Sequence, residues 1–272
     1  ISLYSGKEIM AAKSENFKPT ITKSQKEKLI RLADKYETKD FLKEDPSQFL
    51  YYYNTPQDIE LCSFIAALLS FGSRKQFIPK IQYIMSLADN CGGIYNWLLT
   101  HAFENEFKVS NNKKFYRFYS YRDFYYLFSK LSDIIQIEKS FGIFLHGKYV
   151  EELNNGNSEI NLIDIISDYF SSCSIVPSTK TSAKKRLCMF LRWMVRPGSP
   201  VDIGLWTWYS PDALLIPLDV HVLEEAKKLK LIPPNAGGTR KTCEEITKIA
   251  RTIFVNDPCK LDFALFGLGV DK

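Results

Sequence analysis

The sequence predicts an all-α protein, because nearly every periodic segment of its 272 residues has helical spacing and several begin with helix-capping residues. Residues 64–71, FIAALLSF, are apolar on all sides, which is typical of a helix at the centre of a core. The chain is long enough for one large domain or two small lobes. We therefore predict one helical domain over residues 21–272, divided into two lobes by a cleft.

The expected elements follow in chain order. Residues 1–20 are polar and weakly patterned, and we expect a mobile tail. Residues 55–88 read as two helices broken at Gly72–Ser73, with Thr55 as the cap and Pro56 at the first position. The polar segment 150–161 is predicted to be the crossing between the lobes. The other expected helices cover residues 24–37, 162–170, 183–195, 219–231, 241–254 and 257–269, together with an aromatic-rich segment at 111–137.

Composition excludes several classes of protein. No apolar run approaches the roughly 20 residues that a membrane helix needs, and no signal-peptide core is present, so a cytoplasmic protein is expected. The six cysteines are scattered singly, without the close Cys/His spacing of metal sites, so we predict neither a metal, nor another cofactor, nor a disulfide framework. The net charge of +5 is too small to indicate a nucleic-acid partner by itself.

Basic residues gather before and within the helix expected at 183–195. Between Pro177 and Arg196 the chain has six basic residues and no acidic one. On a helix, Lys185, Arg192 and Arg196 align opposite the apolar face, next to a turn whose Ser and Thr residues can cap the helix. Such an arrangement suits backbone phosphates, and an ordinary solvated face is the alternative. The neighbouring charges of Lys184 and Arg186 favour a neutral Lys185 amine, which can act as a nucleophile.

Asp219 stands where the helix expected at 219–231 begins, between an apolar lead and a segment with early Glu and late Lys residues. By itself it is interpreted as a helix cap, and His221 as a structural histidine. A catalytic role requires that Asp219 and Lys185 face one another.

The segment LLIPLDVHV (214–222) resembles the aspartate segment of the helix-hairpin-helix DNA glycosylase superfamily, in which bifunctional members carry a lysine upstream, where Lys185 stands. ELCSFIAALLSFGSRKQF (60–77) is similar to the superfamily's early buried helix and the loop after it. The combination of KRLCMFLRWMVR (185–196), VDIGLW, IPLDVHV and DFALFGLG resembles a bacterial branch of the superfamily that is similar to the archaeal 8-oxoguanine glycosylases. The chain departs from the superfamily in three ways: VPSTKTSA replaces the glycine-rich hairpin, Lys185 and Asp219 are 34 residues apart, and the four-cysteine iron–sulfur loop is missing.

The resemblance implies a monomeric two-lobed base-excision glycosylase with lyase activity, which flips a damaged nucleotide out of double-stranded DNA. Lys185 would form a Schiff base at C1′ of the sugar and Asp219 would stabilise the cationic sugar. Phe266 is a candidate for the substrate pocket, and Trp206 and Trp208 could stack on the flipped base or pack in the core. The implied DNA contacts are Ser73, Arg74, Lys75, Lys184, Arg186, Arg192, Arg196 and His221.

Three points stay open at this stage. Oxidised purines such as 8-oxoguanine are the favoured substrates, but one sequence does not determine the shape of a pocket. A non-catalytic nucleic-acid binder on the same scaffold, or a monofunctional glycosylase in which Asp219 activates water, would account for the same residues. Tyr116, Arg117 and Phe118 are a further candidate surface contact, with an aromatic core as the alternative.

Overall fold

The structure is a computed structural model that describes residues 17 and 19–270. Its described residues are mostly helical, so the predicted all-α class is confirmed. The predicted tail, residues 1–20, lies almost entirely outside the described residues. The α-helices are α2 (Lys23–Tyr36), α3 (Pro56–Leu69), α4 (Arg74–Asp89), α5 (Ile94–Leu99), α6 (Tyr121–Glu138), α7 (Phe141–Asn154), α8 (Leu162–Tyr169), α9 (Lys185–Val195), α10 (Val220–Lys228), α11 (Arg240–Arg251) and α12 (Lys260–Val270).

Short elements connect these helices. Four are 3-10 helices: η1 (Lys39–Lys43), η2 (Pro46–Tyr51), η3 (Ala102–Asn105) and η4 (Pro211–Ala213). The strands β1 (Lys114–Tyr116) and β2 (Tyr119–Ser120) form an antiparallel hairpin inside the aromatic-rich segment. The hairpin differs from the all-helical pattern that the sequence predicts for this segment.

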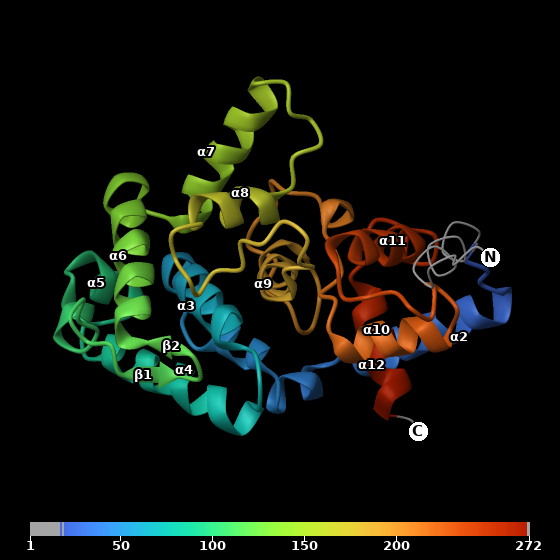
Figure 1. Ribbon diagram of the computed structural model, residues 1–272, viewed down its shortest axis with the longest axis horizontal. Coiled ribbons are helices and arrows are strands. Elements are labelled where there is room, and N and C mark those ends of the chain that lie inside the picture. The colour runs from blue at the N-terminus through green and yellow to red at the C-terminus, as the bar shows by residue number, and fades with distance from the viewer. Residues whose placement is uncertain (1–16, 18, 271–272) are drawn as a thin grey trace, which may run out of the picture.

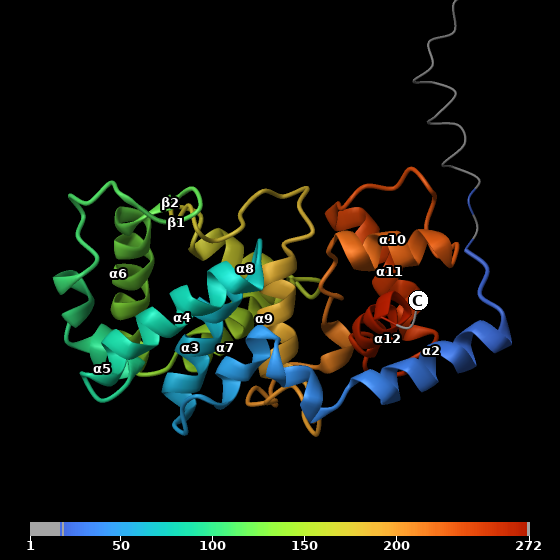
Figure 2. The same ribbon diagram turned by 90° about the horizontal axis from the view of Figure 1, so that it is seen from below.

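The helices lie in two groups in both views (Figures 1 and 2). Helices α3 to α9 form the larger group, and α2 lies along α12 beside α10 and α11. The chain therefore passes between the groups in the segments 37–55 and 196–219. The segment 150–161, predicted to be the crossing, joins α7 to α8 within the larger group, and its first part is the end of α7 rather than a loop. The division into two lobes stays a prediction.

Helix α3 is at the centre of the larger group because its sequence has no polar face. Every residue from Asp58 to Leu69 is buried, and the Phe64 ring contacts the rings of Phe141 and Phe190. The predicted start of this helix is confirmed, since the Thr55 side chain accepts a hydrogen bond from the Asp58 amide and Pro56 occupies the first turn. The predicted break is also found, between Leu69 and Arg74. No helix among the described residues has the length and apolar character needed to span a membrane.

Candidate active site

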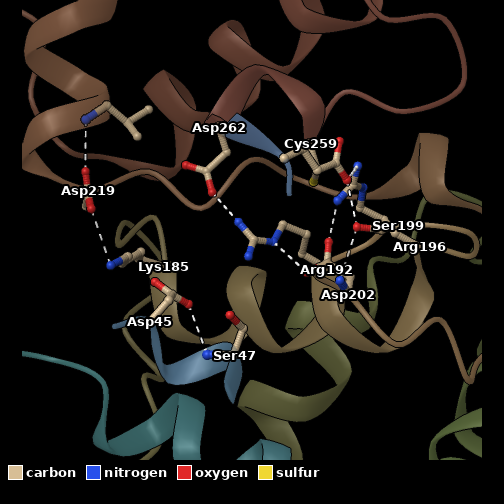
Figure 3. Close-up of polar contacts among 12 residues, drawn as sticks. Asp45, Ser47, Lys185, Arg192, Arg196, Ser199, Asp202, Asp219, Cys259 and Asp262 are labelled. Atoms are coloured by element: carbon tan, nitrogen blue, oxygen red, sulfur yellow. Dashed lines mark hydrogen bonds and ion pairs between the residues drawn. The ribbon is translucent and has the colours of Figure 1, made fainter. Parts of the chain in front are cut away.

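The structure brings Lys185 and Asp219 together across the 34 residues that separate them. Lys185 is the first residue of α9 and Asp219 is the residue before α10, so each charged group lies at the N-terminal end of a helix. The Lys185 Nζ atom is 3.3 Å from Asp219 Oδ2 (Figure 3). The two side chains are 35% and 32% exposed, which leaves both within reach of a ligand.

Asp219 has two roles, one for each carboxylate oxygen. Its Oδ1 accepts a hydrogen bond from the Val222 amide at 2.9 Å, which caps α10 as the sequence predicted. The preceding residues Ile216 and Leu218 are buried, and they fix the chain on its approach to the helix. The cap therefore holds the carboxylate in place while Oδ2 remains directed at the lysine.

The cations next to Lys185 in the sequence bind other partners. Lys184 is buried, and its Nζ pairs with Asp164 at 3.1 Å. The Arg186 guanidinium donates to the Leu68 carbonyl at 2.6 Å and lies over the Phe71 ring. Lys184 is therefore too buried to contact DNA as predicted.

The start of α9 also differs from the expected cap. Lys184 itself occupies the cap position in a left-handed conformation, with φ of 48°, and it makes no side-chain capping bond. Ser182 accepts a hydrogen bond from the Lys184 amide instead, so the serine stabilises the turn before the helix. The expected Ser or Thr cap was wrong because the helix begins at Lys185, two residues later than the expected start at residue 183.

A cavity of about 340 Å³ opens beside the Lys185–Asp219 pair. This volume is within the range of small-molecule sites, roughly 300–1,000 Å³. Part of its wall is apolar and comes mainly from α12, and the rest carries charged side chains that converge from α4, α9, α10 and α12. The lining residues are Phe41, Asp45, Arg74, Lys185, Met189, Arg192, Pro217, Asp219, His221, Val222, Glu225, Asp262, Phe263, Leu265, Phe266 and Gly269.

Asp262 is a charged residue of the cavity that is not among the site residues predicted from the sequence. Its carboxylate accepts a hydrogen bond from Arg192 Nη1 (Figure 3). Burial, together with the negative charge of Asp219, raises the pKa of Asp262 to about 6, although Arg192 acts in the opposite direction. The cavity therefore contains a carboxyl group that holds a proton in mildly acidic solution. In the sequence, Asp262 is the one polar residue of the helical segment DFALF (262–266). Nothing in that pattern indicates that Asp262 and Phe263 line a cavity.

The predicted solvent-facing stripe on α9 is wrong for Arg192 and Arg196. They are only 3% and 2% exposed. The reason is that residues far away in the sequence cover the two guanidinium groups, and Phe263 of α12 lies against both of them. Arg196 pairs with Glu37, Asp202 and Asp257. Arg192 pairs with Asp202 and Asp262 (Figure 3). Neither guanidinium is accessible to a DNA phosphate as predicted.

The aromatic candidates separate into core and cavity residues. Trp206 is buried, and its Nε1 donates to Glu60 at 2.8 Å, so the core interpretation is the correct one. Trp208 stacks on Trp206 and on His146, and neither tryptophan lines the cavity. Phe266 does line the cavity and makes an edge contact with Phe41.

The remaining predicted residues lie at the surface near the cavity. Ser73, Arg74 and Lys75 are exposed at the start of α4, and Arg74 lines the cavity, with its guanidinium 3.8 Å from Asp45. His221 is exposed in the first turn of α10 and also lines the cavity. Among the sequence-based candidates, the structure thus brings Arg74, Arg192, His221 and Phe266 together with the Lys185–Asp219 pair at the cavity.

Comparison with known proteins identifies a family. All six cysteines are free thiols, and no group of three or more His, Cys, Asp or Glu side chains in the described part of the chain is placed to hold a metal ion. No curated protein matches this sequence, and no solved structure matches it. A family model covers residues 45–271, and the chain therefore belongs to the family described as "Protein of unknown function (DUF2400)".

Proposed function

We propose that this protein is a DNA glycosylase with lyase activity, and that its family is a branch of the helix-hairpin-helix glycosylase superfamily. The observation that carries the proposal is the Lys185–Asp219 pair, 3.3 Å apart beside a cavity with aromatic walls. A lysine nucleophile needs a nearby base, and a cationic sugar needs a fixed negative charge. Asp219 is positioned for both tasks because the start of α10 holds its carboxylate.

The proposed reaction begins when Asp219 takes a proton from the Lys185 ammonium. The free amine then forms a bond to C1′ of a nucleotide flipped into the cavity, and the bond from C1′ to the base breaks. The base leaves with that electron pair and gains a proton, for which Asp262 is a donor within the cavity. The sugar ring opens with a proton to its oxygen, which leaves an iminium between Lys185 and C1′. Loss of a C2′ proton then releases the 3′ phosphate.

The cavity rim supports a DNA substrate. Arg74 and His221 are exposed there, at the first turns of α4 and α10, where helix N-termini favour anions. The flipped base would enter between Phe266 and the charged side of the cavity. An oxidised purine such as 8-oxoguanine is the proposed substrate.

Borohydride trapping on duplexes with different lesions tests this proposal. The wild-type protein should give a covalent adduct with at least one lesion duplex, and Lys185→Gln should give none. The matched control is Lys227→Gln, because Lys227 also pairs with a carboxylate, Glu224, but lies outside the cavity. Asp219→Asn should abolish base release without unfolding α10, since asparagine caps a helix as well as aspartate does.

Other outcomes would identify the alternatives. Base release that survives in Lys185→Gln would indicate a monofunctional glycosylase in which Asp219 activates water. Binding to DNA without release from any lesion duplex would indicate a non-catalytic binder.

A further inference from the structure

The hairpin formed by β1 and β2 presents an aromatic ring to solvent within a strongly basic segment. Residues 107–122 contain five basic residues and no acidic one: Lys108, Lys113, Lys114, Arg117 and Arg122. Phe115, Tyr116 and Tyr119 are buried, whereas Phe118, at the tip of the hairpin, is 59% exposed. The arrangement of cations around one exposed ring suits a partner with negative charge and flat aromatic groups.

The hairpin tip has a fixed position because the turn after α3 holds it. The Tyr116 hydroxyl donates to the Phe71 carbonyl, and the Phe71 ring contacts Phe118, with the ring centres 5.5 Å apart. The Lys114 Nζ donates to the Phe118 carbonyl at 2.6 Å. The Arg117 guanidinium lies over the Phe71 ring, 5.6 Å from its centre. These contacts fix the backbone at Phe118 and one side of its ring, while most of the ring stays exposed.

The same turn connects the hairpin to the cavity. The Arg186 guanidinium also lies over the Phe71 ring, with its carbon 4.8 Å from the ring centre. Arg186 directly follows Lys185 in the sequence. Arg74, three residues after Phe71, lines the cavity. In Figure 2 the hairpin and the loop that leads into α9 lie along the same edge of the molecule. Contacts through Phe71 and Arg186 therefore connect the hairpin to the residues beside Lys185 and the cavity.

Positive charge predominates in this region. Lys75, Lys113, Lys114 and Arg117 are exposed. The nearby carboxylates are engaged: Asp45 faces Arg74, and Asp123 accepts hydrogen bonds from Ser120 and Ser174.

We propose that this hairpin surface, residues 113–120 with Lys75, is a second DNA-contacting element, in which Phe118 stacks on a base beside a disrupted base pair. Arg117, Lys114 and Lys75 contact the phosphates on either side. The choice of duplex DNA as the partner rests on the proposed function. Insertion of a ring between bases costs least free energy where the bases are already poorly stacked. Phe118 should therefore favour duplexes with an unpaired or missing base.

The test measures the affinity of the full chain for two duplexes by fluorescence anisotropy, one intact and one with a tetrahydrofuran abasic analogue. Phe118→Ala should bind the abasic duplex about tenfold more weakly, the size of one stacking contact, and bind the intact duplex almost unchanged. Phe118→Trp should keep the wild-type preference. Arg117→Gln should weaken binding to both duplexes and reduce the salt dependence of the affinity by about one phosphate contact. The matched control is Ile143→Ala on α7, because Ile143 is also 59% exposed.

The inference is overturned if Phe118→Ala and Ile143→Ala bind the abasic duplex equally well, or if a matched RNA with a missing base binds more tightly than the DNA. Its failure is distinguishable from that of the proposed function. A wild-type protein that releases no base, but loses abasic-duplex affinity in Phe118→Ala, supports the hairpin surface alone. A protein that forms the Lys185 adduct and is indifferent to Phe118→Ala retains the proposed function without it.

Discussion

Arg196→Met should destabilise the fold strongly, because Arg196 is the cation shared by three carboxylates. Its guanidinium pairs with Glu37 after α2, with Asp257 before α12 and with Asp202, which is fully buried. Methionine fills similar space but leaves these carboxylates without their main partner. Removal of one partner from a buried ion pair costs about 3–5 kcal/mol. For a chain of this size, a loss of about 4 kcal/mol lowers Tm by roughly 8–16 °C.

The loss should also depend on pH in a defined direction. Burial already raises the pKa of Asp202, against the opposing effect of Arg192 and Arg196, and loss of Arg196 raises it further. A carboxyl with a raised pKa in the folded state stabilises the fold when it is protonated, and that stability is lost as pH rises. The variant should therefore be closest to wild type in mildly acidic solution and furthest from it at pH 7 and above.

Urea unfolding followed by circular dichroism, at pH 5 and pH 7, measures both effects. The control is Lys43→Met, which removes the exposed pair with Asp40 and should leave stability unchanged. The reasoning is refuted if Arg196→Met costs less than about 1 kcal/mol at pH 7, or if it costs more at pH 5 than at pH 7.

Two further predictions concern other parts of the fold. The pKa of Asp262 rises from 3.8 to about 6 on folding, so the wild type should lose up to about 3 kcal/mol of unfolding free energy as pH rises from about 4 to 7. Asp262→Asn lacks this loss, and its stability should therefore rise relative to wild type over the same range. Equal pH profiles of the two proteins in urea titrations would contradict this. Gly142→Ala should cost about 1–3 kcal/mol, because its Cβ would lie 2.3 Å from Glu60 Oε1 and 2.5 Å from Trp206 Nε1. Gly147→Ala in the same helix, where the Cβ would meet nothing within 4 Å, should stabilise by up to about 1 kcal/mol; thermal unfolding of the pair shows whether packing or helix propensity decides.

Local signals explain which helices could be predicted from the sequence. The start of α3 follows from Thr55 and Pro56, and the start of α10 from Asp219, because each cap is formed within a few residues. The apolar stretch that fills α3 predicts a central helix without knowledge of its neighbours. The hairpin at 114–120 was missed because strands of three and two residues are too short to show alternation.

The candidate site could be predicted only in part. The sequence pointed to Lys185 and Asp219 through a resemblance, whereas their 3.3 Å contact depends on tertiary packing. Periodicity correctly gave the apolar face of α9, but it treats the opposite face as solvent. Arg192 and Arg196 are buried there because residues far away in the sequence cover them, above all Phe263 and Asp262 of α12. Asp262 likewise reaches the cavity only because tertiary packing brings α12 beside α10.

The buried arginines and the candidate active site are connected through the same helices. Helix α9 begins with Lys185 and carries Arg192 two turns later, and Arg192 binds Asp262 on the wall of the same cavity. Asp219 approaches from α10, which contacts α12. The separation of the amine and the carboxylate is therefore set by how the buried ion pairs hold α9 against α12, and not by either helix start alone. A polar cluster in the core that fixes one relative position of two helices is well suited to this task, because its hydrogen bonds tolerate less sliding than an apolar contact does.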